Sequence, residues 1–155
     1  MFGNIFGVNN GTNVNFIKLN DMAIVPTKGS AAAAGLDLYA AIENPVSIPA
    51  HQTVKIGTGL SFELPTNTFG AIFARSGLAT KEGLRPANCV GVCDSDYRGE
   101  YIIALHNDSE EERVVNPGDR IAQLVVMPFI PINPIEVTDL SYTERGANGF
   151  GSTGK

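Results

Sequence analysis

The chain has 155 residues, charged side chains make up 17% of it, and its net charge is −5 at pH 7. A chain of this length forms one domain that needs no disulfide or metal to hold it together. Its acidity argues against binding to the phosphate backbone of nucleic acids, and the sequence shows neither an apolar run long enough for a membrane helix nor a secretory signal. We therefore expect an intracellular protein with no nucleic-acid or membrane partner.

The predicted strands follow one another in a way that is typical of an all-β fold. The first long one, residues 52–64, alternates, so Val54, Ile56 and Thr58 are expected on one face. Turn-forming Pro, Asn and Asp residues separate the strands at intervals of roughly ten residues. The other strand-like stretches are residues 69–74, 101–105 and 120–127, and the helical candidate is residues 76–82. This spacing predicts a β-sandwich or β-barrel with one short helix.

Two short segments carry polar residues within strands that are otherwise apolar. Alternation in residues 35–40 places Leu36 and Leu38 on one face and Asp37 on the other. In residues 117–123 a turn leads into a strand that carries Gln123. Taken singly, such segments are more often structural than functional.

Residues 74–79 lie where a predicted strand becomes the short helix. Backbone N–H groups at the start of a helix favour anions, and Arg75 adds a positive charge. Ser76 has no histidine nearby in a recognisable arrangement, so a hydroxyl that donates to phosphate is favoured over a nucleophile. Capping of the helix by Ser76 is the structural alternative.

Residues 88–100 predict a β-hairpin with Asp94 and Asp96 at its turn. Asp94 follows small apolar residues, where partial desolvation would make its carboxylate a useful base. The structural alternative is that both are ordinary turn residues. Cys89 and Cys93 are too far apart on an extended strand for a disulfide, so two reduced thiols packed in a core are expected.

Residues 145–155 are rich in glycine, which allows backbone N–H groups to converge on an anion. Ser152 and Thr153 add hydroxyl groups, Arg145 adds charge, and Phe150 is free to stack on a planar ring. The segment is therefore either a lid over an aromatic ring and phosphates or a frayed end. It also matches G-x-x-x-x-G-K, but a phosphate-binding P-loop needs a strand before it and a helix after it, which this segment does not provide.

Five segments, taken in order, resemble the five motifs of the trimeric dUTPase (deoxyuridine triphosphate nucleotidohydrolase) family. They are A-G-L-D-L-Y, R-S-G-L-A, G-V-C-D-S-D-Y-R-G-E, G-D-R-I-A-Q-L and R-G-A-N-G-F-G-S-T-G, within about residues 25–154. Each motif is loose by itself, but five in order are specific. Two departures are small, since Cys93 stands where the family usually has Ile and Ala74 replaces a common Pro.

The resemblance implies a jelly-roll, or distorted β-barrel, subunit with one short helix in a homotrimer with shared active sites. It implies Mg²⁺-assisted hydrolysis of dUTP to dUMP and pyrophosphate, which limits uracil in DNA and supplies dUMP for dTMP synthesis. By this interpretation residues 1–20 are unassigned and residues 21–141 form the barrel domain. Residues 142–155 then form a flexible arm that closes over a neighbouring subunit's site.

The resemblance also implies roles for residues that contact the base, the sugar and the attacking water. Asp94 would hold and activate the water that attacks the α-phosphorus, and Asp37 would reach Mg²⁺ only through water. The hairpin backbone at Gly91 and the side chain of Asn88 would bind the uracil edge. Tyr97 would lie under the deoxyribose and exclude a 2′-hydroxyl group.

The remaining implied site residues bind the phosphates or belong to the arm. The phosphates would be held by Arg75, Ser76, Gly77 and Gln123. The arm would supply Arg145, Phe150, Gly151, Ser152 and Thr153, with the phenylalanine stacked on uracil and the arginine and hydroxyl groups on phosphates.

Two other functions stay open on the sequence. A dCTP deaminase on the same scaffold would release ammonia, but that relative lacks this hairpin pattern and uses a Glu for deamination. A nucleotide-gated binding module would instead use dUTP as a signal that orders the arm for a protein partner.

Overall fold

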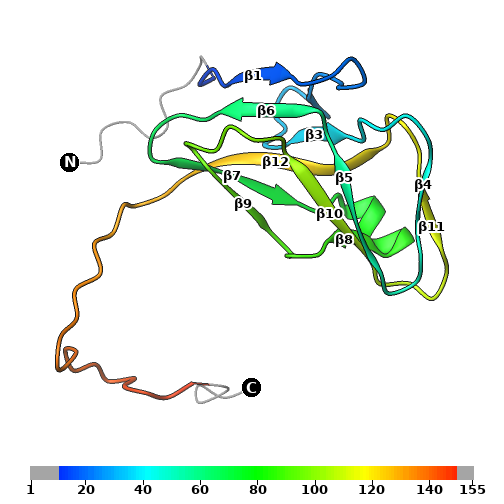
Figure 1. Ribbon diagram of the computed structural model, residues 1–155. Helices are drawn as coiled ribbons and strands as arrows, with labels where there is room; N and C mark the ends of the chain where they lie inside the picture. Colours follow the sequence, from blue (N-terminus) through cyan, green and yellow to red (C-terminus); the bar gives the residue numbers. More distant parts are fainter. Residues whose placement is uncertain (1–10, 150–155) are drawn as a thin grey trace.

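The computed structural model describes residues 11–149, which fold into twelve short strands and one helical turn (Figure 1). The turn, η1, is a π-helix at Leu78–Glu82. Within this range no helix has the length and apolar character needed to span a membrane. The all-β prediction with one short helix is confirmed. The strands are β1 (Asn15–Lys18), β2 (Thr27–Lys28), β3 (Leu36–Tyr39), β4 (Val46–Ile48), β5 (Thr53–Gly57), β6 (Leu60–Glu63), β7 (Thr68–Phe73), β8 (Leu84–Pro86), β9 (Gly91–Asp94), β10 (Ile102–Asn107), β11 (Arg113–Val115) and β12 (Arg120–Pro128).

The strands form antiparallel sheets around one core. The largest sheet has five strands in the order β2-β3-β12-β7-β9, and a three-stranded sheet has the order β5-β10-β8. Two further sheets have two strands each, β1 with β6 and β4 with β11. In Figure 1, β10 crosses the direction of β12 and β7, which belong to the other sheet.

Alternation along the strands decides which side chains are buried. In β5, Ile56 is buried and Lys55 is exposed. In β3, Leu38 is fully buried while Asp37 faces the opposite side. The first long predicted strand is divided in two because Gly59, at φ +63°, turns the chain between β5 and β6.

The predicted hairpin at residues 88–100 is wrong in its pairing. The turn after Asp94 is present, since the N–H of Tyr97 donates to the Asp94 carbonyl at 3.1 Å. However, β9 pairs with β7, and β10 pairs with β5 and β8. The two strands diverge because the backbone groups of each are satisfied by strands of a different sheet. They therefore leave a gap between them instead of a ladder of hydrogen bonds.

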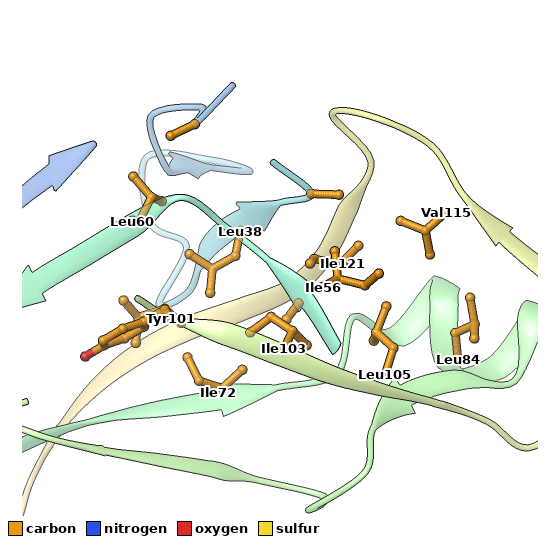
Figure 2. Close-up of a cluster of buried hydrophobic side chains, with 14 of the residues drawn as sticks. Leu38, Ile56, Leu60, Ile72, Leu84, Tyr101, Ile103, Leu105, Val115 and Ile121 are labelled. Carbon is orange, nitrogen blue, oxygen red and sulfur yellow. The ribbon is translucent and has the colours of Figure 1, made fainter. Parts of the chain in front are cut away.

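The core between the sheets is one continuous cluster of buried side chains (Figure 2). Burial of this apolar surface is the main source of stability. Tyr101 lies at one end of the cluster in Figure 2, with its hydroxyl oxygen directed away from the aliphatic side chains. The members labelled there are Leu38, Ile56, Leu60, Ile72, Leu84, Tyr101, Ile103, Leu105, Val115 and Ile121.

The chain leaves the barrel after β12 (Figure 1), and residues 129–149 form neither strand nor helix. Large apolar side chains follow one another along this stretch, and Ile132 and Leu140 are 80% and 88% exposed. Exposed apolar surface of this extent is typical of interaction surfaces. We call residues 129–142 the apolar strip.

Candidate active site

The predicted phosphate-binding residues come together in one pocket on the outer face of the five-stranded sheet. The site is built from the ends of β3, β7 and β12 and from the turn that leads into η1. We call it the phosphate pocket. Its polar lining comprises Asp37, Arg75, Ser76, Gly77, Arg120 and Gln123.

Asp37 joins two guanidinium groups in this pocket. Its carboxylate accepts a hydrogen bond from Arg75 Nε at 2.9 Å and another from Arg120 Nη1 at 3.2 Å. The Asp37 side chain is 13% exposed, whereas that of Arg120 is 49% exposed. Two cations and one carboxylate leave the pocket with a positive balance, which suits an anionic ligand.

The sequence did not predict Arg120 as a site residue, because β12 contains a local irregularity. In a regular strand, residues 120 and 123 point to opposite faces. The register against β3 shifts between Arg120 and Ala122, a β-bulge that brings Arg120 and Gln123 to the same pocket. The only sequence signal was a basic residue that immediately follows the turn.

Close backbone approaches fix the other groups of the phosphate pocket. Gln123 Nε2 donates to the Ala74 carbonyl at 2.8 Å, and a Cβ on Gly35 would lie 2.7 Å from Gln123 Oε1. The N-cap of η1 is Gly77 and has no side-chain capping bond. Ser76 is therefore not the capping residue, and the structural alternative for its hydroxyl group is wrong.

A second pocket, of about 300 Å³, occupies the gap between β9 and β10. We call it the base pocket. Four of the predicted residues line it: Asn88, Gly91, Asp94 and Tyr97. Among the strands of residues 11–149, none pairs with the edge of β9 that faces away from β7, so backbone N–H and C=O groups there are available to a ligand in this gap.

Asp94 ends β9 and is exposed, so the expected partial desolvation is absent in the single chain. Tyr97 stands beside it and is 45% exposed. Its hydroxyl donates to the Glu100 carbonyl at 3.1 Å. The carboxylate and the aromatic ring thus share one wall of the base pocket.

The prediction for the two cysteines is confirmed in part. Both are free thiols, as expected. Cys93 packs partly against the core, where burial raises the pKa of its thiol. Cys89 is exposed and lies in the turn between β8 and β9, where its backbone has φ +61°. The expected packing in the core is therefore correct for Cys93 and wrong for Cys89.

The base pocket and the phosphate pocket are separate sites in one copy of the chain. The base pocket lies beside β9, the edge strand of the five-stranded sheet, and the phosphate pocket lies on the outer face of that sheet. The two pockets share no lining residue.

The arm residues are only partly described. Arg145 is exposed, and its Nε donates to the Asn148 carbonyl at 3.0 Å. It lines neither of the two pockets. The predicted contacts of Phe150, Gly151, Ser152 and Thr153 lie outside the described residues.

The side chains present fit a metal ion that arrives together with phosphate oxygens. Among residues 11–149 no group of three or more His, Cys, Asp or Glu side chains gathers to form a metal cage. Both oxygens of Asp37 are engaged by arginines. Mg²⁺ typically keeps several waters and binds through one or two carboxylates plus substrate phosphates, so Asp37 fits contact with Mg²⁺ through water.

Comparison with known proteins identifies relatives over most of the chain. A sequence profile of the dUTPase family matches residues 21–154. A deoxyuridine 5′-triphosphate nucleotidohydrolase of Desulfitobacterium hafniense is 48% identical over 141 residues, covering 90% of this chain and 93% of that protein. One from Candida albicans is 48% identical over 133 residues, covering 84% and 81%.

Solved structures have the same fold. A mutant dUTPase of the staphylococcal phage 80α superposes with a TM-score of 0.83 at 24% identity, covering 90% of this chain and 98% of that one. Another mutant of the phage 80α enzyme, solved with dUpNHpp, has a TM-score of 0.81 at 24% identity, covering 94% and 100%. The expected jelly-roll fold is confirmed.

The chain is a jelly-roll domain with a carboxylate-bearing pocket between β9 and β10 and a separate pocket that holds two arginines. The profile match and the relatives that are 48% identical show that the chain belongs to the dUTPase family.

Proposed function

We propose that this chain hydrolyses dUTP to dUMP and pyrophosphate, with a water molecule held by Asp94 attacking the α-phosphorus. The observation that carries the proposal is the separation of the polar groups into a base pocket that holds a carboxylate and a phosphate pocket that holds two arginines. Such an arrangement binds the two ends of a nucleoside triphosphate and leaves the reaction to a positioned water.

The base pocket accounts for selection of uracil. The backbone of β9 at Gly91 and the amide of Asn88 provide donors and acceptors in a fixed geometry. A base with the wrong edge leaves some of these groups unpaired, which is a strong penalty. Tyr97 forms the surface under the sugar, where a ribose 2′-hydroxyl would collide with the ring.

In this proposal Asp94 acts as the general base. It stands at the mouth of the base pocket and accepts no side-chain hydrogen bond from the described residues, so both oxygens are free to orient a water. Transfer of a proton from this water to the carboxylate would generate the attacking oxygen. No covalent nucleophile is required, since phosphoryl transfer depends on position and on neutralised charge.

The phosphate pocket supplies local positive charge to a protein that is acidic as a whole. Arg75, Ser76, Gly77 and Gln123 hold the triphosphate in this proposal, and Arg120 adds a second guanidinium group. Mg²⁺, when bound to the triphosphate, would neutralise phosphate charge and so lower the barrier to attack. Asp37 would contact that ion only through its water shell.

The proposed assembly is a homotrimer in which different copies complete each active site. Two observations support it: the pockets share no lining residue in one copy, and the apolar strip is exposed in the single chain. The arm of a neighbouring copy would then reach the site, with Phe150 on uracil and Arg145, Ser152 and Thr153 on phosphates. Closure of this arm would exclude water other than the one at Asp94.

The test compares release of pyrophosphate from dUTP, UTP, dTTP and dCTP, with ammonia release from dCTP measured in parallel. We expect turnover of dUTP alone. Asp94→Asn should abolish turnover and still bind a non-hydrolysable dUTP analogue, because the amide keeps the shape but not the basicity of the carboxylate. Near-normal turnover by this variant would contradict the assigned base, and ammonia release from dCTP would favour a deaminase.

A further inference from the structure

Tyr101 contains a buried polar group that the proposed chemistry does not use. The residue is 2% exposed. Among residues 11–149 its Oη is the only buried side-chain polar atom that has no hydrogen-bond partner. A buried hydroxyl group without a partner lowers stability, so a phenylalanine would fill the same space at lower cost. Any role of Tyr101 therefore depends on its ring and not on its hydroxyl group.

The ring of Tyr101 reaches from the chain just before β10 to β7 of the five-stranded sheet. Its backbone is fixed beside β6, since its N–H donates to the Leu60 carbonyl at 2.8 Å and its carbonyl accepts from Thr58 Oγ1 at 2.7 Å. Its hydroxyl reaches β7, where a Cβ on Gly70 would lie 3.3 Å from Oη. Gly70 is paired with Cys93 of β9. Burial raises the pKa of the Tyr101 hydroxyl, and the Cys93 thiol adds to the rise.

The same ring supports the residues that form the base pocket. The ring centroids of Tyr97 and Tyr101 are 6.1 Å apart, and those of Phe62 and Tyr101 are 4.7 Å apart. Cys93, at the hydroxyl end, immediately precedes Asp94. Tyr101 itself lines the base pocket. One side chain therefore contacts both the strand that ends in Asp94 and the loop that carries Tyr97.

We propose that Tyr101 is a positioning residue whose ring acts as a spacer between β9 and β10 and so fixes the places of Asp94 and Tyr97. The inference rests on the proposed function, in which Asp94 orients the water and Tyr97 excludes ribose. Because β9 and β10 share no hydrogen-bonded ladder, the width of the gap depends on side-chain packing. Without the ring, β9 and Tyr97 move toward the core, and both attack and sugar selection suffer.

The test compares Tyr101→Leu with Tyr101→Phe and with a matched core variant, Leu105→Ala. Leu105 lies on β10, which begins immediately after Tyr101, and it is fully buried. Its truncation therefore destabilises the core at a residue that does not itself line the base pocket. Turnover of dUTP and UTP is measured at a temperature below the thermal unfolding transition of every variant, so that each one is folded. We expect Tyr101→Leu to lower kcat for dUTP and raise the UTP/dUTP ratio of kcat/KM, each by roughly tenfold.

The conservative variant separates the ring from its hydroxyl group. Tyr101→Phe keeps the spacer and should restore kcat and the ratio, with an unchanged or higher Tm because the unpartnered hydroxyl is gone. Leu105→Ala should lower Tm and leave the ratio unchanged. Equal ratios in Tyr101→Leu and Leu105→Ala would reduce Tyr101 to a core residue and overturn the proposal, as would a Tyr101→Phe variant as impaired as Tyr101→Leu.

If Tyr101→Leu does not fold, a substitution in β9 tests the same inference. Cys93→Val adds bulk against the Tyr101 hydroxyl and should shift the UTP/dUTP ratio, and adding Tyr101→Phe should relieve the crowding and restore it. A Cys93→Val enzyme with wild-type kcat and ratio would overturn the inference. Failure of the proposed function can be distinguished from failure of this inference, because in that case the wild-type chain itself would not turn over dUTP.

Discussion

Tyr97 owes its conformation to a neighbour without a side chain. Its hydroxyl donates to the Glu100 carbonyl at 3.1 Å, so the ring lies back over its own loop. A Cβ on Gly99 would overlap the hydroxyl end of that ring. The surface proposed to lie under the sugar is therefore built by residues adjacent in sequence, and glycine is required there for close approach rather than for an unusual backbone angle.

Gly99→Ala should relax the discrimination against ribonucleotides. The ring, and not the backbone, must move to make room for the new methyl group, so stability should change little. We expect the UTP/dUTP ratio of kcat/KM to rise about tenfold, as for the loss of one steric contact in a specificity pocket. Gly11→Ala is the control, since a Cβ there meets nothing within 4 Å. An unchanged ratio with Gly99→Ala would mean that Tyr97 does not select the sugar.

Single residues show where sequence reasoning succeeds and where it stops. The placement of Leu38 inside and Asp37 outside follows from alternation and is confirmed. The position of Arg120 could not be predicted, because a bulge breaks the alternation of its strand. The exposure of Cys89 could not be predicted either, because its positive φ reverses the chain. Such local departures depend on tertiary contacts that a pattern of residue types does not contain.

At the scale of elements, the pairing of β9 and β10 is the main fact that the sequence could not provide. A turn between two strand-like runs favours a hairpin, but β9 gains its hydrogen bonds from β7 and β10 from β5. The existence of these strands was predictable, because it depends on local patterns. Their partners depend on long-range competition among strands, and the base pocket exists only because that competition separates them.

The end of β10 is tied to β8 by a paired charge. Asp108 accepts hydrogen bonds from Arg85 Nε at 2.5 Å and Nη2 at 2.9 Å. The hydrogen bond from Arg85 holds the pKa of Asp108 below its usual value. A carboxyl with a lower pKa in the folded state than in the unfolded state stabilises the fold above its unfolded pKa, near pH 4, and loses this contribution as the pH falls through the folded value.

Asp108→Asn should therefore destabilise the protein at neutral pH and lose its effect in acid. Urea unfolding of wild type and variant, repeated from pH 7 down to pH 3, measures the difference in free energy of unfolding. We expect the difference to shrink below about pH 4. Asp21→Asn, which removes an exposed carboxylate in the turn after β1, is the control and should show no such trend. A difference that stayed constant into acid would argue against the ion pair.

At the scale of the whole molecule, two features remain unexplained by a single chain. The two pockets proposed to bind the ends of one nucleotide share no lining residue, and the apolar strip, with Ile130 at 84% and Tyr142 at 93% exposure, contacts little of its own barrel. The proposed association of copies would account for both, because one copy's base pocket would meet another's phosphate pocket while the strip became buried.

Two truncations separate assembly from closure of the site. A chain cut after Tyr142 keeps the apolar strip and loses Arg145 and Phe150, so we expect a folded trimer with little dUTP turnover. A chain cut after Pro128 also loses the strip and should be largely monomeric. Light scattering coupled to size exclusion gives the mass, and pyrophosphate release gives the activity. Full turnover after the first cut would remove the arm from the mechanism, whereas a trimer after the second would show that the barrels associate without the strip.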